Sequence, residues 1–518
     1  MRAVRFLFSF ALGAIAALGF APWSLWPLTL IAFAVLLFLV HEAPTLRRAL
    51  GIGWLFGVGH FCVANAWLKQ PFEYQDAMPH WLGYVAVLLA SVYLAIYPML
   101  AAGLAWRFGS TARGDLAARP DTAFVLAAGA AWIVTEYLRG TMFTGYPWDP
   151  LSVIWVSELS VAQLAALVGT YALSGLTVVL AGALLLMVQG RWRSALAIAL
   201  PFAVAGIFPY WIIPSPDQAS RKIVVVQPNL PEEERPTDNY AENNFRALAK
   251  LSRRTDPGTP PRLLFWPEGA IRFPLEDGYP GYVYASLGTA TMARLRMGAL
   301  LGDNDAILTG AQTMKFNAAE DVVAATNSIV LAGPDARLHG RYDKAHLVPF
   351  GEYLPMRPLL EAIGLSRLVP GDVDFIPGPG ARTINVPGFG KVGMLICYEV
   401  VFSGATVDPA SRPDLIFNPS NDAWFGPLGP PAHLAQAQLR AIEEGIAIVR
   451  STPTGISAII WPNGQIRQSI PLGHSGAIED ILPPKFEPTP FARIGNWMVA
   501  LVSALLLLTA IAIRRRAR

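Results

Sequence analysis

Residues 391–399 read Lys-Val-Gly-Met-Leu-Ile-Cys-Tyr-Glu, an apolar run that ends abruptly at a cysteine and two polar residues. Such a run is typical of a buried strand in a layered α/β domain. Layered α/β folds place reactive groups at the ends of their strands. A free cysteine is more often a packing residue, but its position makes Cys397 a candidate nucleophile.

The residues around this run alternate between strand-like and helix-like segments. The strand-like segments are 221–227, 263–266, 306–312, 327–331, 392–397, 415–418 and 455–461, and the helix-like ones are 238–253, 282–300 and 431–447. This alternation predicts a layered α/β domain.

The composition indicates that the rest of the chain is membrane-embedded. Of 518 residues, 53% are hydrophobic and only 15% are charged, against about 25% charged in an ordinary soluble chain. The mean hydropathy is +0.40. A net charge of +3 gives no reason to expect a nucleic-acid partner. The two cysteines, Cys62 and Cys397, form no disulfide framework and have no metal-ligand spacing, and Cys62 is expected to be a packing residue.

Eight apolar runs are long enough to cross a bilayer as helices, which takes about 20 residues. They lie at 5–21, 25–41, 50–68, 81–106, 122–139, 161–188, 194–213 and 494–513. We therefore predict a polytopic α-helical membrane protein with about eight transmembrane helices. Its parts are a seven-helix domain at 1–213, the α/β domain at 214–493, and a closing helix with a basic tail at 494–518.

Basic residues in the short loops predict the topology, because Lys and Arg concentrate on the cytoplasmic side. Arginines occur in alternate loops and at both ends of the chain: Arg2, Arg5, Arg47, Arg48, Arg107, Arg113, Arg119, Arg191, Arg193, Arg514, Arg515, Arg516 and Arg518. The loops between them, 22–27, 69–80 and 140–160, contain one basic residue, Lys69. We expect both termini to be cytoplasmic and residues 214–493 to lie outside the cytoplasm.

Two further segments carry candidate catalytic residues. Glu268 follows the apolar run in Phe265-Trp-Pro-Glu-Gly269, where burial would raise its pKa and suit it to proton transfer. Lys344 and Glu352 flank the loop Lys344-Ala-His-Leu-Val-Pro-Phe-Gly-Glu-Tyr-Leu-Pro355, and a lysine ammonium can stabilise an oxyanion. His346, in the same loop, is an alternative base for the thiol.

Glu268, Lys344 and Cys397, in this order and spacing, resemble the nitrilase (carbon–nitrogen hydrolase) superfamily. Asn418-Pro-Ser-Asn-Asp-Ala-Trp-Phe-Gly426 matches the superfamily as well. The loop 344–355 is similar almost letter for letter to that of its membrane branch, the apolipoprotein N-acyltransferases. Further matches to that branch are Phe20-Ala-Pro22, Trp132, Glu136, Arg139, Gly145-Tyr-Pro-Trp148 and Arg440-Ala-Ile-Glu443.

The resemblance implies a nitrilase-like αββα sandwich on the periplasmic side of a bacterial inner membrane. A membrane phospholipid would give its sn-1 acyl chain to Cys397, and the α-amino group of a diacylated apolipoprotein would accept the chain in a ping-pong reaction. The resemblance makes Glu268 the base and Lys344, with the Tyr398 N–H, the stabiliser of the oxyanion. Glu352 would assist this triad, and Tyr398 and Glu399 would shape the pocket. No metal or cofactor is implied.

Two alternatives stay open on the residues alone. One is a membrane-tethered, nitrilase-type amidase that passes its acyl group to water, and the other is a transporter or scaffold with a degenerate domain. The resemblance makes His346 part of the loop architecture, and Glu136 and Arg139 are expected to form a structural pair. Arg235-Pro236 and Pro453 depart from the family pattern and leave the substrate lid undetermined.

Overall fold

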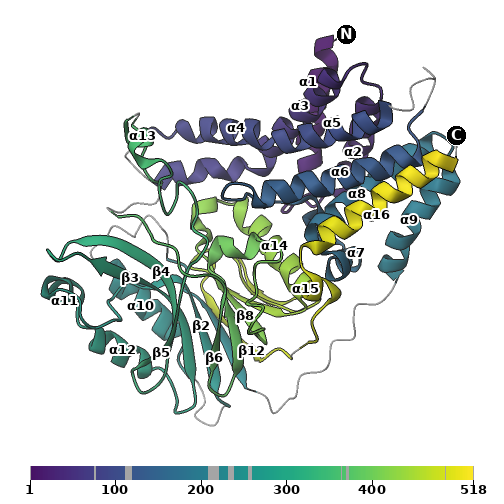
Figure 1. Ribbon diagram of the computed structural model, residues 1–518. Coiled ribbons are helices and arrows are strands. Elements are labelled where there is room, and N and C mark those ends of the chain that lie inside the picture. The colour runs from purple at the N-terminus through teal and green to yellow at the C-terminus, as the bar shows by residue number, and fades with distance from the viewer. Residues whose placement is uncertain are drawn as a thin grey trace.

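The computed structural model describes residues 2–74, 78–110, 119–207, 221–230, 239–254, 260–362, 364–368, 373–484 and 486–516. Arg113, Arg518, Arg235-Pro236 and the predicted end of the seventh span at 208–213 lie outside these ranges. The described chain forms a helical bundle stacked on a two-sheet domain (Figure 1).

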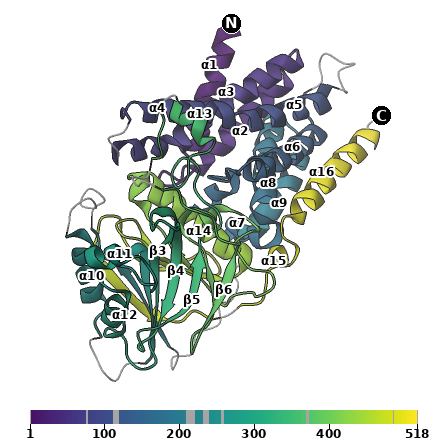
Figure 2. The same ribbon diagram turned by 60° about the vertical axis from the view of Figure 1, so that its left-hand side comes forward.

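Apolar helices build the bundle. The main helices are α1 (Arg2–Ala17), α2 (Trp26–His41), α3 (Leu46–Ala64), α4 (Leu82–Leu94), α5 (Ile96–Ser110), α6 (Thr122–Thr141), α8 (Ala165–Val188), α9 (Trp192–Ile207) and α16 (Trp497–Arg516). Shorter pieces are η1 (Ala66–Tyr74), η2 (Leu151–Ser157), α7 (Leu159–Ala162) and α15 (Pro490–Ile494). Helix α16 lies beside α6 and α8, so the two ends of the chain share one bundle (Figures 1 and 2).

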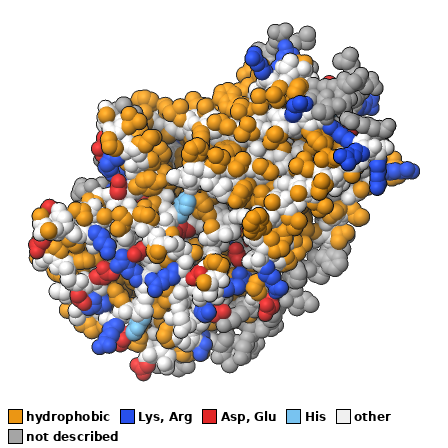
Figure 3. Space-filling view, viewed as in Figure 1, with side chains coloured by type: hydrophobic (Ala, Val, Ile, Leu, Met, Phe, Trp, Pro, Cys, Tyr) orange, Lys and Arg blue, Asp and Glu red, His pale blue; other side chains and the backbone are white. Residues whose placement is uncertain are grey.

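The bundle has the surface of a membrane-embedded body. Among the described residues, three helical stretches are long and apolar enough to cross a membrane: Leu82–Gly109, Ala165–Val188 and Trp497–Arg516. A fourth is reached if α3 and η1, which bend by 45° at their junction, form one span. Apolar side chains dominate the visible face of the bundle, whereas charges are scattered over the domain below (Figure 3). The expected total of eight spans stays a prediction.

Two six-stranded mixed sheets form the second body. The first has the order β12-β1-β2-β3-β4-β5, with β1 (Lys222–Gln227), β2 (Arg262–Ile271), β3 (Ala306–Phe316), β4 (Val322–Ala332), β5 (Leu338–Asp343) and β12 (Gly476–Ile481). The second has the order β11-β10-β9-β8-β7-β6, with β6 (Arg382–Val386), β7 (Gly390–Met394), β8 (Leu415–Pro419), β9 (Ala447–Ser451), β10 (Ser457–Ile460) and β11 (Ile466–Ile470). In each sheet three parallel strands, β1–β3 and β7–β9, are flanked by antiparallel ones.

The sheets pack face to face through apolar side chains, as at Phe265 and Phe417, whose ring centroids are 4.9 Å apart. The outer face of the first sheet is covered by α10 (Tyr240–Leu251) and α12 (Ala290–Gly298), with α11 (Gly281–Leu287) beside them. Helix α14 (Gly429–Glu444) covers the second sheet. The predicted αββα sandwich is therefore confirmed.

Three local expectations differ from the structure. The segment 282–300 is two helices rather than one, because Gly288 has φ +82° and ends α11. Strand β7 ends at Met394, so Cys397 begins a separate turn instead of ending the strand. Strand β2 continues past Glu268 to Ile271.

The sandwich is joined to the bundle at a break in α8. Gly169 has φ +79°, and a side chain there would collide with the ring of Phe491. The N–H of Thr170, freed by the break, donates to the carboxylate of Glu443 from α14, which also pairs with Arg440. All three polar residues are buried. Helix α14 is thus fixed between sheet and bundle.

Candidate active site

Glu268 is placed by an irregularity in β2. The pairing of β2 with β3 shifts register between Trp266 and Ile271. Pro267 has no N–H to give to a neighbouring strand, and Gly269 adopts φ +61°, a conformation that glycine adopts without strain. The Pro-Glu-Gly sequence therefore turns Glu268 out of the regular ladder, whereas the sequence alone placed it after the strand.

Both carboxylate oxygens of Glu268 accept hydrogen bonds. Oε1 accepts from Nδ2 of Asn327 at 2.7 Å, and Oε2 accepts from the backbone N–H of Asn421 at 2.6 Å. Burial raises the pKa of Glu268 above its ordinary value, and the Glu352 carboxylate adds to the rise while the Lys344 ammonium opposes it. A raised pKa suits a general base that must take a proton and later return it.

Lys344 and Glu352 form a buried ion pair. Nζ of Lys344 lies 2.8 Å from Oε2 of Glu352, and the two side chains are 1% and 8% exposed. The same oxygen accepts from the backbone N–H of Val348 at 2.8 Å, which ties the pair to its loop. Although burial opposes the charged form, Glu352, Glu268 and Cys397 together hold the pKa of Lys344 above its ordinary value. Lys344 therefore presents a fixed positive charge.

Asn327, at the middle of β4, connects these groups and was not singled out from the sequence. Its Nδ2 donates to Glu268 at 2.7 Å and to Oε1 of Glu352 at 3.0 Å, so both amide hydrogens are used. Its carbonyl accepts from the backbone N–H of Lys344 at 2.8 Å. The side chain of Asn327 thus holds the two carboxylates next to each other, and its backbone carbonyl fixes the backbone of Lys344.

Cys397 begins the 3-10 turn η4 (Cys397–Val401) with φ +50°. This left-handed conformation costs a non-glycine residue about 1–2 kcal/mol, so neighbouring contacts must hold it. The residue is 6% exposed. Burial raises the pKa of its thiol and Glu268 adds to the rise, while Lys344 opposes it. The thiol is therefore protonated at rest and needs a base before it can act as a nucleophile.

Glu399 ties the nucleophile turn to the lysine loop. Its Oε2 accepts from the N–H of Ile396 at 2.7 Å. Its Oε1 accepts from the hydroxyl of Tyr342 at 2.8 Å and from the N–H groups of Ala345 and His346 at 2.7 and 3.0 Å. Glu399 is buried, and burial raises its pKa while the donors oppose the rise.

For the acyl transfer that the sequence resemblance implies, replacing Glu399 by Gln is expected to slow acylation of Cys397 by about 10- to 100-fold, because the new amide must direct an N–H at one of four donors. A buried donor without an acceptor costs about 1–3 kcal/mol. The contacts of Glu399 that fix the turn beside Lys344 would be weakened by this free energy. Tyr342→Phe, which removes one of the four hydrogen bonds to Glu399, is the matched control and should slow acylation less. Single-turnover acylation rates measure both, and equal losses would contradict the role of the carboxylate.

Tyr398 and His346 lie in an aromatic cluster. The His346 ring centroid is 3.8 Å from that of Phe402 and 6.0 Å from that of Tyr398. The Tyr398 ring is buried and makes an edge contact with Phe402 at 5.1 Å. His346 thus packs against aromatic rings of the segment that begins at Cys397.

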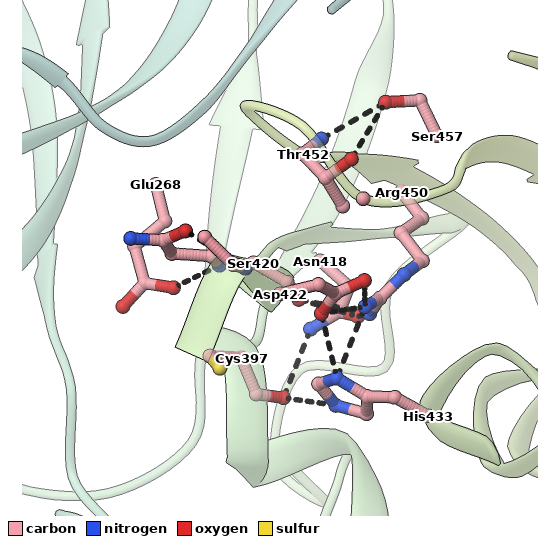
Figure 4. A network of polar contacts seen from close by, with 12 residues as sticks. Glu268, Cys397, Asn418, Ser420, Asp422, His433, Arg450, Thr452 and Ser457 are labelled. Carbon is pink, nitrogen blue, oxygen red and sulfur yellow. Dashed lines mark hydrogen bonds and ion pairs between the residues drawn. The ribbon is translucent and has the colours of Figure 1, made fainter. Parts of the chain in front are cut away.

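Further polar residues lie behind the nucleophile, and the sequence did not predict their contacts with it. The carbonyl of Cys397 accepts from Nε2 of His433 at 3.2 Å and from Nδ2 of Asn418 at 3.4 Å. Asp422 and Arg450 complete this network (Figure 4). Asn418 and Asp422 belong to a motif already noted, but His433 and Arg450 come from α14 and β9, and no spacing linked them to Cys397.

The expected pair in the bundle is also present. Arg139 lies 3.7 Å from Glu136, and both side chains are buried. Arg139 donates to the carbonyls of Tyr146 and Trp148 at 2.8 and 2.7 Å, and so holds the loop over the sandwich. Within the described part of the chain, no group of three or more His, Cys, Asp or Glu residues could hold a metal ion.

Comparisons with known proteins match both bodies. Residues 12–184 match the model of the apolipoprotein N-acyltransferase N-terminal domain, and residues 223–478 match that of carbon–nitrogen hydrolase. Three curated relatives are each called apolipoprotein N-acyltransferase. The chain is 30% identical to the one from Rhodopseudomonas palustris, over 97% of this chain and 94% of the relative. It is 32% identical to that of Bradyrhizobium diazoefficiens, over 99% and 95%, and 33% identical to that of Caulobacter vibrioides, over 97% and 93%.

Proposed function

Because the chain belongs to the apolipoprotein N-acyltransferase family, we propose that it moves an acyl chain from a membrane phospholipid to the N-terminal amine of a diacylated apolipoprotein, by way of a thioester on Cys397. The observation that carries the mechanism is the joined cluster of Glu268, Asn327, Glu352 and Lys344, coupled electrostatically to Cys397. Together these residues supply a base, a fixed cation and a nucleophile.

The first half-reaction loads the enzyme. Glu268 takes the Sγ proton of Cys397, and the thiolate attacks the carbonyl carbon of the sn-1 ester. The negative charge that develops on the carbonyl oxygen is stabilised by the Lys344 ammonium and by the N–H of Tyr398. When the intermediate collapses, the C–O bond of the ester breaks, Glu268 returns the proton to the leaving oxygen, and lysophospholipid departs.

The second half-reaction discharges the thioester. Glu268 accepts a proton from the ammonium of the S-diacylglyceryl cysteine, and the free amine attacks the thioester carbonyl. The same donors stabilise the second oxyanion, and the C–S bond breaks as the amide forms. Glu268 releases the first proton to solvent, takes the second proton from the nitrogen as the amide forms, and passes it to the departing thiolate of Cys397. Since one site serves both substrates in turn, the kinetics are ping-pong.

The proposal places this site at the outer surface of a bacterial inner membrane, on eight spans with both termini cytoplasmic. Both substrates are lipids held in a bilayer, so the catalytic domain at 214–493 must lie against it. Support comes from the apolar bundle directly beside the sandwich and from basic side chains at the end of the bundle away from it (Figure 3). Segment 1–213 then forms seven spans, and 494–518 carries the eighth.

Intact-protein mass spectrometry tests the function directly. Purified protein is mixed in detergent with a phosphatidylethanolamine that carries palmitoyl at sn-1 and oleoyl at sn-2, and Cys397→Ala serves as the blank. We expect the protein to gain the mass of one palmitoyl group. Neutral hydroxylamine should release this group, and a synthetic diacylated lipopeptide added in its place should accept it. An oleoyl adduct would contradict the sn-1 assignment. Discharge to free fatty acid with the peptide present would indicate an amidase-type hydrolysis, and no adduct would refute the thioester.

A further inference from the structure

The backbone of Cys397 is held from behind by two side chains of the second sheet and its helix. Its carbonyl accepts from Nε2 of His433 at 3.2 Å and, at a longer 3.4 Å, from Nδ2 of Asn418, which also donates to the carbonyl of Leu395 at 2.9 Å. His433 is fully buried in α14. In Figure 4 its ring lies directly against the Cys397 carbonyl, on the side of the network that contains Asp422 and Arg450.

The direction of this carbonyl also fixes the direction of the next N–H. A trans peptide is planar, and its C=O and N–H groups point in opposite directions. The peptide that links Cys397 to Tyr398 therefore directs the Tyr398 N–H away from His433. If this peptide rotated, its carbonyl would replace the N–H on the other side and would repel an oxyanion there. Cys397 sits at φ +50°, where a non-glycine residue is strained, so its orientation needs a partner.

The surroundings of His433 determine which ring nitrogen carries hydrogen. Burial lowers the pKa of His433, and the Arg450 guanidinium lowers it further while Asp422 opposes the shift. The ring is therefore neutral and has one N–H. A carbonyl oxygen can only accept, so the contact with Cys397 requires this hydrogen on Nε2, whereas the contact of Nδ1 with Oδ1 of Asp422 would require it on Nδ1. With its hydrogen on Nε2, Nδ1 can accept from Nη2 of Arg450 at 3.0 Å. Oδ1 of Asp422 also lies 3.0 Å from Nδ1, and the same carboxylate holds the guanidinium through contacts of 2.6 and 2.7 Å.

We propose that His433 is a positioning residue, which locks the Cys397–Tyr398 peptide with its carbonyl inward and its N–H directed at the reacting oxygen. Arg450, as a donor to Nδ1, favours the tautomer that donates from Nε2, and Asp422 holds Arg450 in place. Arg450 also donates to the side chains of Asn418 and Ser420 at 2.6 and 2.8 Å, so it supports both donors to the Cys397 carbonyl. This inference rests on the proposed function, in which the Tyr398 N–H stabilises the oxyanion.

The test compares His433→Gln with His433→Met. The two side chains are both unbranched and similar in length, and both lose the ring contacts with Trp148 and Phe425, but only glutamine can donate to the carbonyl. Each variant is assayed for single-turnover acylation by the palmitoyl-oleoyl phospholipid. Each is also assayed for alkylation of Cys397 by iodoacetamide, followed on the Cys397 peptide so that Cys62 does not interfere. Alkylation needs the thiolate but forms no oxyanion.

We expect His433→Met to slow acylation by about 100-fold, close to the loss of one oxyanion donor, with the alkylation rate and the apparent lipid KM unchanged. His433→Gln should stay within about tenfold of the unchanged protein. The positioning role of His433 would be overturned if both variants lost acylation equally, or if acylation and alkylation fell in parallel. If His433→Met does not fold, a 100-fold loss in folded His433→Gln would overturn it as well. Absence of any adduct in the unchanged protein would instead refute the proposed function.

Discussion

Replacing Glu268 by Gln is expected to slow acylation of Cys397 by about 10³-fold, within the range for loss of a positioned general base. The change keeps the shape of the side chain but removes the group that takes the thiol proton. It also directs an amide N–H at one of two donors, Asn327 or Asn421, that now point at carboxylate oxygens. Single-turnover acylation by phospholipid, followed by intact-protein mass spectrometry, measures the loss.

The pH dependence of alkylation separates loss of the base from general damage. In the unchanged protein the alkylation rate should fall as pH drops through the pKa of Glu268, which lies above the ordinary value, because the protonated carboxyl cannot accept the thiol proton. In Glu268→Gln this step in the profile should disappear. Glu320→Gln, a change at an exposed carboxylate in the same domain, is the matched control. A step that persists in Glu268→Gln would assign the proton transfer to another group.

The sequence predicted most of the sandwich because most strands of its core are short apolar runs bounded by polar or turn residues, but β9 at Ala447–Ser451 was not among the expected strands. The segment 221–227 became β1 at Lys222–Gln227, and 431–447 became α14 at Gly429–Glu444. Glu268 and Cys397 could be proposed because each follows such a run. The local geometry of these two residues could not be predicted, since it depends on a register shift beside Gly269 and on a positive φ at Cys397.

The supporting residues were missed for a different reason. Asn327 lies within a strand between Thr326 and Ser328, and polar residues inside a strand give no sign of their partners. His433 and Arg450 are fully buried, and they lie near Cys397 only because α14 packs on the second sheet and β9 is a strand of it. A contact between residues so far apart in sequence depends on the tertiary fold. Breaks in the bundle, such as Gly169 in α8, likewise follow from packing against the sandwich rather than from hydropathy.

Replacing Lys344 by Met is expected to lower both activity and stability. The loss of the cation should slow acylation by about 10²–10³-fold, because the developing oxyanion loses its charged partner. The same change leaves Glu352 buried without its ion pair at 2.8 Å. Breaking a buried pair from one side costs about 3–5 kcal/mol. Thermal unfolding in detergent and single-turnover acylation report the two effects separately.

The double variant Lys344→Met/Glu352→Gln distinguishes the loss of activity from the loss of stability. Removing both charges relieves the uncompensated carboxylate, so thermal stability should recover part of its loss; the remainder persists because the new amide N–H faces Nδ2 of Asn327, which donates to Glu352. Acylation should stay at least as slow as in the single variant, because no cation has been restored beside the reacting carbonyl. The glutamine can still accept the N–H of Val348 through its amide oxygen, which keeps the loop in place. Recovery of acylation together with stability would mean that Lys344 only balances charge, and the oxyanion would then depend on backbone donors such as the N–H of Tyr398.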